Sequence, residues 1–292
     1  MGEGMETRSS KVHAVVLTAF SLAVAVLVGW TIKSGWGYFT TPLSARPHHP
    51  GFQDFRAGGL VGHGIGILGS FMIVLLLLYS MRKRMHALQR AGDLRIWLRY
   101  HIFLGIAGPI LITLHTAFKV GGLVAVSYWS MVAVALSGFF GRYLYQQLPR
   151  NVLGETMSVE EIEAKNEAVL VELSNLGMDD RAAALLEDIA LRKLEHRAAP
   201  VALLLLPFLN GILARQLQRW ALRFAEGDRP AAVKLAKAWA LQTRRLRLFD
   251  LIRDLFHYWH VFHKPFAFIM IIVMIVHVGV AVALGYVWKF GS

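Results

Sequence analysis

The stretch HVFHKPFAFIMIIVMIVHVG, residues 260–279, decides the fold class of this chain. Its middle is apolar over nearly the length that a helix needs to cross a bilayer core, about 20 residues. His263 and His277 stand at the two ends of this apolar middle. Imidazole is a costly side chain in hydrocarbon unless it has a partner, so the two histidines point to a function within the membrane.

The composition is that of a membrane protein. Hydrophobic residues make up 55% of the 292 residues and charged residues only 17%, with a mean hydropathy of +0.48. A soluble domain needs fewer apolar residues to fill its core. The net charge of +12 comes mostly from basic residues beside the apolar runs, a pattern typical of contact with anionic lipid and not of nucleic-acid binding. We therefore expect anionic lipid, and no nucleic acid, as a partner.

Apolar runs of spanning length predict an all-α fold, an integral membrane helical bundle with five transmembrane helices. The five runs are residues 13–32, 59–81, 99–118, 123–146 and 263–287. We interpret the first run as a retained helix, because no A-x-A cleavage site precedes a clear mature start.

Lysine and arginine residues predict the orientation of the bundle. The connection between the second and third spans is strongly basic, with Arg82, Lys83, Arg84, Arg90, Arg95 and Arg99. Residues 147–262 are also basic, whereas residues 33–58 hold three basic residues and Trp36 of an aromatic belt. We expect a cytoplasmic N-terminus and an external C-terminus in a bacterial inner membrane.

The polar insert predicts three segments: transmembrane residues 1–146, a cytoplasmic helical insert 147–254, and the last span with its tail, 255–292. Ser158 and Glu161 form a capping-box pattern at the start of an insert helix. Residues 199–217 are apolar enough to raise a sixth span, but two prolines and following arginines favour a core or membrane-surface helix. A sixth span would reverse the direction of the last helix.

Two pairs of histidines share one spacing. His101 and His115 are fourteen positions apart (115 − 101), as are His263 and His277 (277 − 263). Fourteen residues of helix turn almost four full circles and rise about 21 Å, so each pair lies on one helix face near opposite sides of the bilayer. If the two helices run parallel, His101 meets His263 near the cytoplasm and His115 meets His277 near the outside. Two facing imidazoles at each level predict a bis-histidine haem site.

The absence of cysteine narrows the redox chemistry. A chain without cysteine has no thiolate for an iron–sulfur cluster and none for covalent haem attachment. Any haem is therefore expected to be the non-covalent b type, and two matched histidine pairs predict two haem b groups. The other interpretation of such histidines is structural, in which each one bonds to a neighbouring helix or lines a water cavity.

HIFLGIAGPILITLH (101–115) and HKPFAFIMIIVMIVH (263–277) resemble the paired helices of transmembrane di-haem b-type cytochromes. These include the ferric reductase and NADPH oxidase membrane domain and the four-helix haem bundle of cytochrome b. The resemblance covers roughly residues 59–146 and 255–287, and it implies two stacked haems. The sequence ends at Ser292 without the flavin and nicotinamide domains of the reductases, so we expect the electron donor on another polypeptide.

Several further residues are predicted to contact the haems. Gly105 and Gly108 let a porphyrin approach the backbone, or else serve ordinary helix packing. His63 has three possible roles: it supports a ligand or lines a quinone site, it forms a helix–helix hydrogen bond, or it ligates a cofactor. The cationic residues that flank the haem levels are candidates to pair haem propionates, with membrane anchoring as the alternative: Arg99, Lys119 and Lys264.

Two imidazole ligands leave no open iron position, so one-electron transfer is the expected chemistry. The sequence predicts a cytochrome b subunit that carries electrons between a quinone pool or cytoplasmic donor and an acceptor on the other face. It would act within a larger oxidoreductase, with quinone or quinol and other subunits as partners. The alternatives are a stand-alone reductase, acting on ferric iron or between superoxide and quinone, and a non-redox transporter or scaffold.

Overall fold

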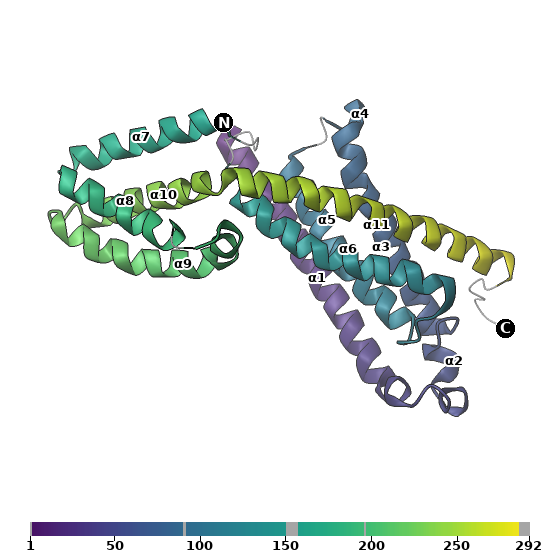
Figure 1. Cartoon of the computed structure of the whole chain (residues 1–292). Coiled ribbons are helices and arrows are strands. Elements are labelled where there is room, and N and C mark those ends of the chain that lie inside the picture. The colour runs from purple at the N-terminus through teal and green to yellow at the C-terminus, as the bar shows by residue number, and fades with distance from the viewer. Residues whose placement is uncertain (1, 90–91, 150–156, 196, 286–292) are drawn as a thin grey trace. The chain divides into compact units, whose positions relative to one another are not determined.

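A computed structural model describes residues 2–89, 92–149, 157–195 and 197–285 of the chain (Figure 1). Every regular element in these ranges is a helix, which confirms the predicted all-α class. The elements are α1 (Gly2–Thr40), η1 (Arg46–His48), α2 (Phe52–Phe55), α3 (Leu60–Arg84), α4 (His86–Gln89), α5 (Leu94–His115), α6 (Gly122–Gln147), α7 (Val159–Asn175), α8 (Asp180–Glu195), α9 (Ala199–Trp220), η2 (Ala221–Arg223), α10 (Arg229–Arg247) and α11 (Phe249–Ala283).

The chain divides into two compact units. The first unit comprises Met1–Phe139 and Val261–Ser292, and the second comprises Phe140–His260. Helices α6 and α11 each begin in one unit and end in the other. The histidine pairs of the sequence lie in the first unit, and the polar insert lies in the second.

Helix α1 is longer than the apolar run 13–32 that predicted it. It continues to Thr40, because nothing interrupts the backbone before Pro42. Thr40 and Thr41 bond their hydroxyls to carbonyls one turn earlier, at Trp36 and Gly37. Residues 33–40 are therefore helical, and the short helices η1 and α2 lie in the remainder of the segment 33–58.

The most extensive helix pair of the first unit is α3 with α5. Glycines on α3 allow this approach: an added Cβ at Gly66 would overlap the ring of His115, and one at Gly69 would lie 3.0 Å from Ile112. Gly66 and Gly69 thus form a close-packing surface on α3. It brings α3 directly against the helix that carries His101 and His115.

Helix α6 is antiparallel to both α5 and α11. The Ser127 hydroxyl donates to the Met270 carbonyl (2.9 Å) and Ser137 pairs with His263 Nδ1 (2.8 Å), so residue numbers run in opposite directions along α6 and α11. Only residues 116–121 connect α5 to α6, and Thr113 lies 3.4 Å from the Tyr128 hydroxyl. Since α6 opposes both neighbours, α5 and α11 run parallel in the first unit.

Within the part of the chain that the structure describes, six helices are long and apolar enough to cross a membrane, as expected of a multi-pass membrane protein. They are Lys11–Thr40, Phe52–Arg84, Leu94–His115, Gly122–Gln147, Ala199–Arg223 and Phe249–Ala283. Five of them match the predicted spans. The sixth is α9, the segment for which the sequence favoured a core or surface helix, so length and apolarity alone do not fix the number of crossings at five.

Helices α7 to α10, drawn from teal to green in Figure 1, lie in the second unit, which also includes the end of α6 and the start of α11. The predicted capping box is present at the start of α7, where Ser158 and Glu161 bond each other's backbone N–H. Gly177 follows the end of this helix with φ +93°, a conformation that glycine adopts without strain. RAAALLEDIALRKLEH (181–196) and AAVKLAKAWALQTRRLRLF (231–249) also predict amphipathic helices in the insert. These two helices are confirmed as α8 and α10.

Candidate functional site

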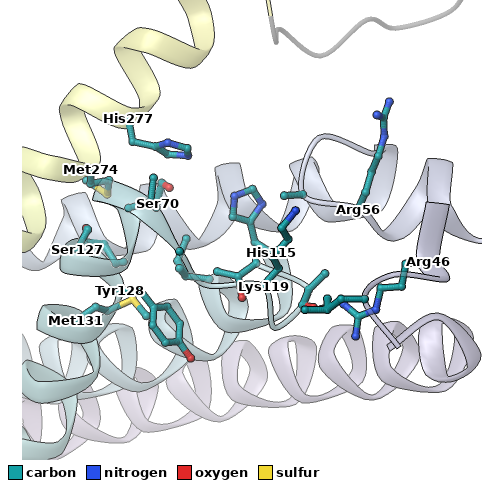
Figure 2. A pocket seen from close by; sticks show the side chains of 18 of the residues that line it. Arg46, Arg56, Ser70, His115, Lys119, Ser127, Tyr128, Met131, Met274 and His277 are labelled. Atoms are coloured by element: carbon teal, nitrogen blue, oxygen red, sulfur yellow. The ribbon is translucent and has the colours of Figure 1, made fainter. Parts of the chain in front are cut away.

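A cavity of about 490 Å³ opens in the first unit, a size typical of ligand pockets (Figure 2). Helices α1, α3, α5, α6 and α11 all contribute to its wall, together with the segment between α1 and α3. One part of the lining is apolar and rich in methionine, with Ile73, Ile112, Met131, Met270 and Met274. Another part is cationic, with Arg46, Arg56 and Lys119. The cavity therefore suits a large apolar molecule that bears negative groups.

His115 lies in the cavity wall with one ring nitrogen engaged. Its Nδ1 is 2.9 Å from the Gly62 carbonyl oxygen of α3. A carbonyl only accepts, so Nδ1 carries the proton in the neutral ring, and Nε2 keeps its lone pair. Metal-binding histidines commonly show this arrangement, since the bonded nitrogen fixes the ring while the other nitrogen ligates. His115 is thus prepared to act as a ligand.

His277 lines the same cavity from α11. Figure 2 shows its ring extending from the helix toward the space beside His115. His277 and His63 are both close enough to His115 to interact with it electrostatically. The structure therefore brings together the pair that was predicted for the outer level, and it adds His63 nearby. His63 remains open among its three predicted roles.

A strained turn sets the position of His115 at the end of α5. Ala117 and Phe118 have positive φ angles of 47° and 62°, which are uncommon for residues other than glycine. The buried guanidinium of Arg46 holds this turn, because it donates to the carbonyls of Ala117, Phe39 and Thr41. The same turn carries Lys119 to the cavity. Arg46 thereby ties the end of α1 to the end of α5.

The inner pair occupies separate surroundings. The His101 ring lies 4.9 Å from the Tyr79 ring of α3, and it is beside the Leu76 carbonyl. Its Nδ1 is buried without a well-formed hydrogen bond. His263 pairs through Nδ1 with the Ser137 hydroxyl of α6. The cavity lining includes neither His101 nor His263, so their meeting at one haem remains a prediction.

The other predicted contact residues take varied positions. Gly108 faces α3, where an added Cβ would lie 3.2 Å from Ile73, and Gly105 faces Leu76 of the same helix. Both glycines thus serve the packing of α5 on α3, while contact with a porphyrin remains a prediction. Lys119 lines the cavity, and the side chains of Arg99 and Lys264 are exposed. Lys119 is therefore the predicted propionate partner that the structure places best.

The residues present fit a haem at the outer level. Two imidazoles come from two helices to one cavity, and the proton of His115 is directed away from it. Comparison with protein families, curated proteins and solved structures gave no match. Within the described residues no group of three or more His, Asp or Glu side chains forms a metal site. A haem held by two histidines requires no such group.

Sequence reasoning missed Arg46 and Arg56 as cavity residues. A signal for them existed, because they are two of the three basic residues in the segment 33–58, which the orientation rule expects to be poor in positive charge. A basic residue that departs from that rule needs a local reason. Here Arg46 holds the turn after α5, and Arg56 stands at the cavity with its guanidinium 5.2 Å from the Phe52 ring.

Proposed function

We propose that this chain is a di-haem b-type cytochrome that carries electrons across a membrane. It exchanges them between a quinone pool or cytoplasmic donor and an acceptor on the other face, as a subunit of a larger oxidoreductase. The observation that carries the proposal is the placing of His115 and His277 in one cavity, with His115 Nδ1 bonded to Gly62. An imidazole with Nδ1 engaged presents Nε2 to a metal.

The chain's own residues would hold one haem between His115 and His277 and the other between His101 and His263. A haem with two imidazole ligands supplies one-electron transfer and no open position for oxygen. Gly62 and Ser137 orient His115 and His263 through their Nδ1 atoms. The apolar wall of α6 and α11 excludes water, and Lys119 and Arg56 offer positive charge to carboxylate groups at the cavity.

The direction of the helices supports this pairing of ligands. Because α5 and α11 run parallel, residues near their C-terminal ends lie at one level, and residues toward their N-terminal ends lie at the other. His115 and His277 share the first level, as the common spacing of the two pairs predicts. Antiparallel helices would instead have paired His115 with His263.

The donor or acceptor on the cytoplasmic side is proposed to be another subunit. Helices α8 and α10 in the second unit offer charged amphipathic surfaces, with exposed Asp188, Arg192, Lys234 and Lys237. Surfaces of this kind bind proteins or anionic lipid. A partner that contacts residues 178–250 would complete the electron path.

Haem content of the purified chain tests the proposal. We expect two b haems per chain in a pyridine haemochrome assay, and one haem in His115→Ala and in His277→Ala. His101→Ala and His263→Ala should lose the other haem, with a different redox midpoint remaining. His48→Ala, at an exposed residue of η1, should keep both. A wild-type chain without haem contradicts the proposal, while loss of both haems from every variant contradicts separate sites.

A further inference from the structure

Helix α9 has one face that is completely buried in protein. Leu203, Leu206, Leu209, Leu213 and Leu217 are at most 2% exposed. Leu213 and Leu217 belong to a hydrophobic cluster with Leu173 of α7, Leu186 of α8 and Ala236 of α10. Leu203, Leu206 and Leu209 belong to a second cluster, with Leu144 of α6, Ile162 of α7, Leu194 of α8 and Ile252 of α11. This face is therefore covered by the other helices of the second unit.

Two of the helices that cover α9 are polar on the outside. Helix α8 exposes Glu187 and Asp188, and α10 exposes Lys234 and Lys237. Charged side chains of this density are not stable in the hydrocarbon core of a bilayer. A helix packed against them cannot be surrounded by lipid along its length. The apolar residues on the buried face of α9 are thus explained by the protein core. The apolar residues on its exposed face need another explanation.

The opposite face of α9 is an exposed stripe. Val201, Leu204 and Phe208 are 46%, 66% and 68% exposed, with a spacing that keeps them on one side of the helix. The same stripe continues through Gly211 to exposed Arg215, Gln218 and Arg219. Helix α9 contains no acidic residue. The stripe is therefore apolar in its first half and cationic in its second half.

We propose that this stripe rests on the surface of the anionic bilayer and that α9 does not cross it. The apolar half enters the boundary of headgroups and acyl chains, which extends about 5–10 Å into the membrane. Arg215 and Arg219 lie roughly 10 Å or more further along the helix axis, where they meet lipid phosphates. Arg223, exposed just beyond the helix, extends the same cationic end.

Two features of the chain direct the stripe to a bilayer and not to a soluble partner. The second unit is entered through α6 and left through α11, which are both apolar helices of spanning length, so the unit is tethered to the membrane at both ends. Cationic residues beside an exposed apolar strip are the complement of an anionic lipid surface. This inference needs only that the first unit spans the membrane, and not that it holds haem.

A surface location of α9 also accounts for the direction of the last helix. If α9 crossed the bilayer, α11 would run opposite to α5. The hydrogen bonds of α6 give a parallel α5 and α11 within the first unit. The two observations come from different units of the chain, and both favour five crossings.

Spin labels on the full chain test the inference directly, because the native sequence contains no cysteine. Leu204→Cys, Gly211→Cys and Gln218→Cys place nitroxides along one stripe, seven residues apart, and Gly211 has open space beside it. The protein is reconstituted in vesicles of phosphatidylcholine and phosphatidylglycerol in equal parts. Collision with oxygen, compared with a water-soluble nickel complex, then reports the depth of each label.

We expect depth to decrease steadily from Leu204→Cys to Gln218→Cys, with a several-fold higher oxygen-to-nickel ratio at the first. Glu187→Cys on exposed α8 is the control and should stay in water. A spanning helix would instead be deepest at Gly211→Cys, with both flanking labels shallower. Labels that are all in water would mean that a soluble partner, or none, covers the stripe. Either result overturns the inference.

Replacement of the three arginines tests the contribution of positive charge to membrane binding. Arg215→Gln with Arg219→Gln and Arg223→Gln should reduce immersion of the Leu204→Cys label, and the same replacements by lysine should retain it. In vesicles of phosphatidylcholine alone, immersion of the Leu204→Cys label should be reduced as it is in the glutamine variant. Unchanged immersion in both cases would show that anionic lipid is not the occupant. Circular dichroism of each variant checks that the helices remain folded.

Discussion

Lys119 is the one of the three predicted propionate partners that lines the cavity. It is exposed, lies four positions beyond His115 and lines the cavity that His115 and His277 share. Its position depends on the turn at Ala117 and Phe118, which Arg46 holds through a carbonyl. The turn therefore fixes the position of Lys119 relative to His115, the proposed ligand. Either side chain can be replaced without replacing the other.

Replacing Lys119 by glutamine should lower the midpoint potential of the outer haem. A positive charge beside the cavity favours acceptance of an electron, and its loss removes that attraction. We expect a decrease on the order of 20–50 mV, given the distance and solvent screening. Lys264→Gln, an exposed lysine next to His263, is the matched control and should affect the inner haem only. A redox titration that shows equal shifts in both haems would contradict this assignment.

Gly66→Ala should disturb His115 more than its size suggests. The added methyl group would overlap the His115 ring, so α3 and α5 must separate or the ring must leave Gly62. We expect destabilisation of about 1–3 kcal/mol, as for overpacking in a core, together with loss of the outer haem. Gly29→Ala on α1 is the control, since nothing lies within 4 Å of its added Cβ. Thermal loss of the haem absorption distinguishes the two variants.

At the scale of single residues, the sequence indicates the paired histidines but not the residues that hold them in place. Helix periodicity fixes which histidines share a face, so the fourteen-residue spacing was readable along one helix. Arg46 was not readable in this way, because one of its partners, the Ala117 carbonyl, is 71 positions away. Contacts between distant segments carry no local pattern. The pairing of Ser137 with His263 was missed for the same reason.

At the scale of elements, Arg244 fastens the second unit. Its guanidinium is 1% exposed and donates to the Ala190 carbonyl at 2.7 Å and to Asn210 at 2.9 Å. Helix α10 is thereby joined to both α8 and α9 through one side chain. These two acceptors are a backbone carbonyl and a side-chain amide oxygen, so dipoles stabilise the cation.

Arg244→Met should destabilise the second unit by roughly 2–4 kcal/mol, because buried acceptors lose a charged donor. Hydrogen exchange of α8 to α10 in the full chain measures the effect as faster exchange. Arg192→Met is the control, since Arg192 is 70% exposed and its pair with Asp188 is a surface pair; its effect should be under about 1 kcal/mol. Equal effects of the two variants would contradict the role of Arg244.

The difference in stability of the second unit between Arg244→Met and Arg192→Met should not depend on pH in the neutral range. Burial lowers the pKa of Arg244 to about 10. The folded unit thus holds this proton less tightly than the unfolded chain does, so the desolvation penalty is fully present below pH 10 and relieved only above it. We expect the difference in the free energy of protection, corrected for the intrinsic exchange rate, to stay constant between roughly pH 6 and 9. A slope in that range would assign the effect to another group.

Elements with strong local signals were predicted, and those with competing signals were not. The capping box of Ser158 and Glu161 and the amphipathic helices α8 and α10 follow from the sequence directly. The end of α1 was placed too early, because the end of an apolar run is not the end of a helix; Thr40 and Thr41 continue it as polar residues. Helix α11 likewise begins before its apolar run, at Phe249.

At the scale of the whole molecule, the number of crossings decides the side of the C-terminus. Five crossings with a cytoplasmic N-terminus place Ser292 outside, whereas six place both ends in the cytoplasm. We expect no signal from a cytoplasm-specific reporter fused to Ser292 and a strong signal from an exported alkaline phosphatase at the same position. The same reporters inserted after Asp179, at the start of α8, serve as the control and should behave oppositely. The same reporter signals at Ser292 and after Asp179 would overturn this topology.

The parallel arrangement of α5 and α11 has a consequence for the order of synthesis. About 100 residues separate the end of α6 from the start of α11, which at ribosomal rates of 5–20 residues per second is a delay of roughly 5–20 s. During this interval α5 is already in the membrane and its two histidines have no opposite helix. The cavity wall formed by Met270, Met274 and His277 arrives last. A nascent chain is therefore open on that side until the insert has been made, and the proposed haem would have a lateral route that the finished protein closes.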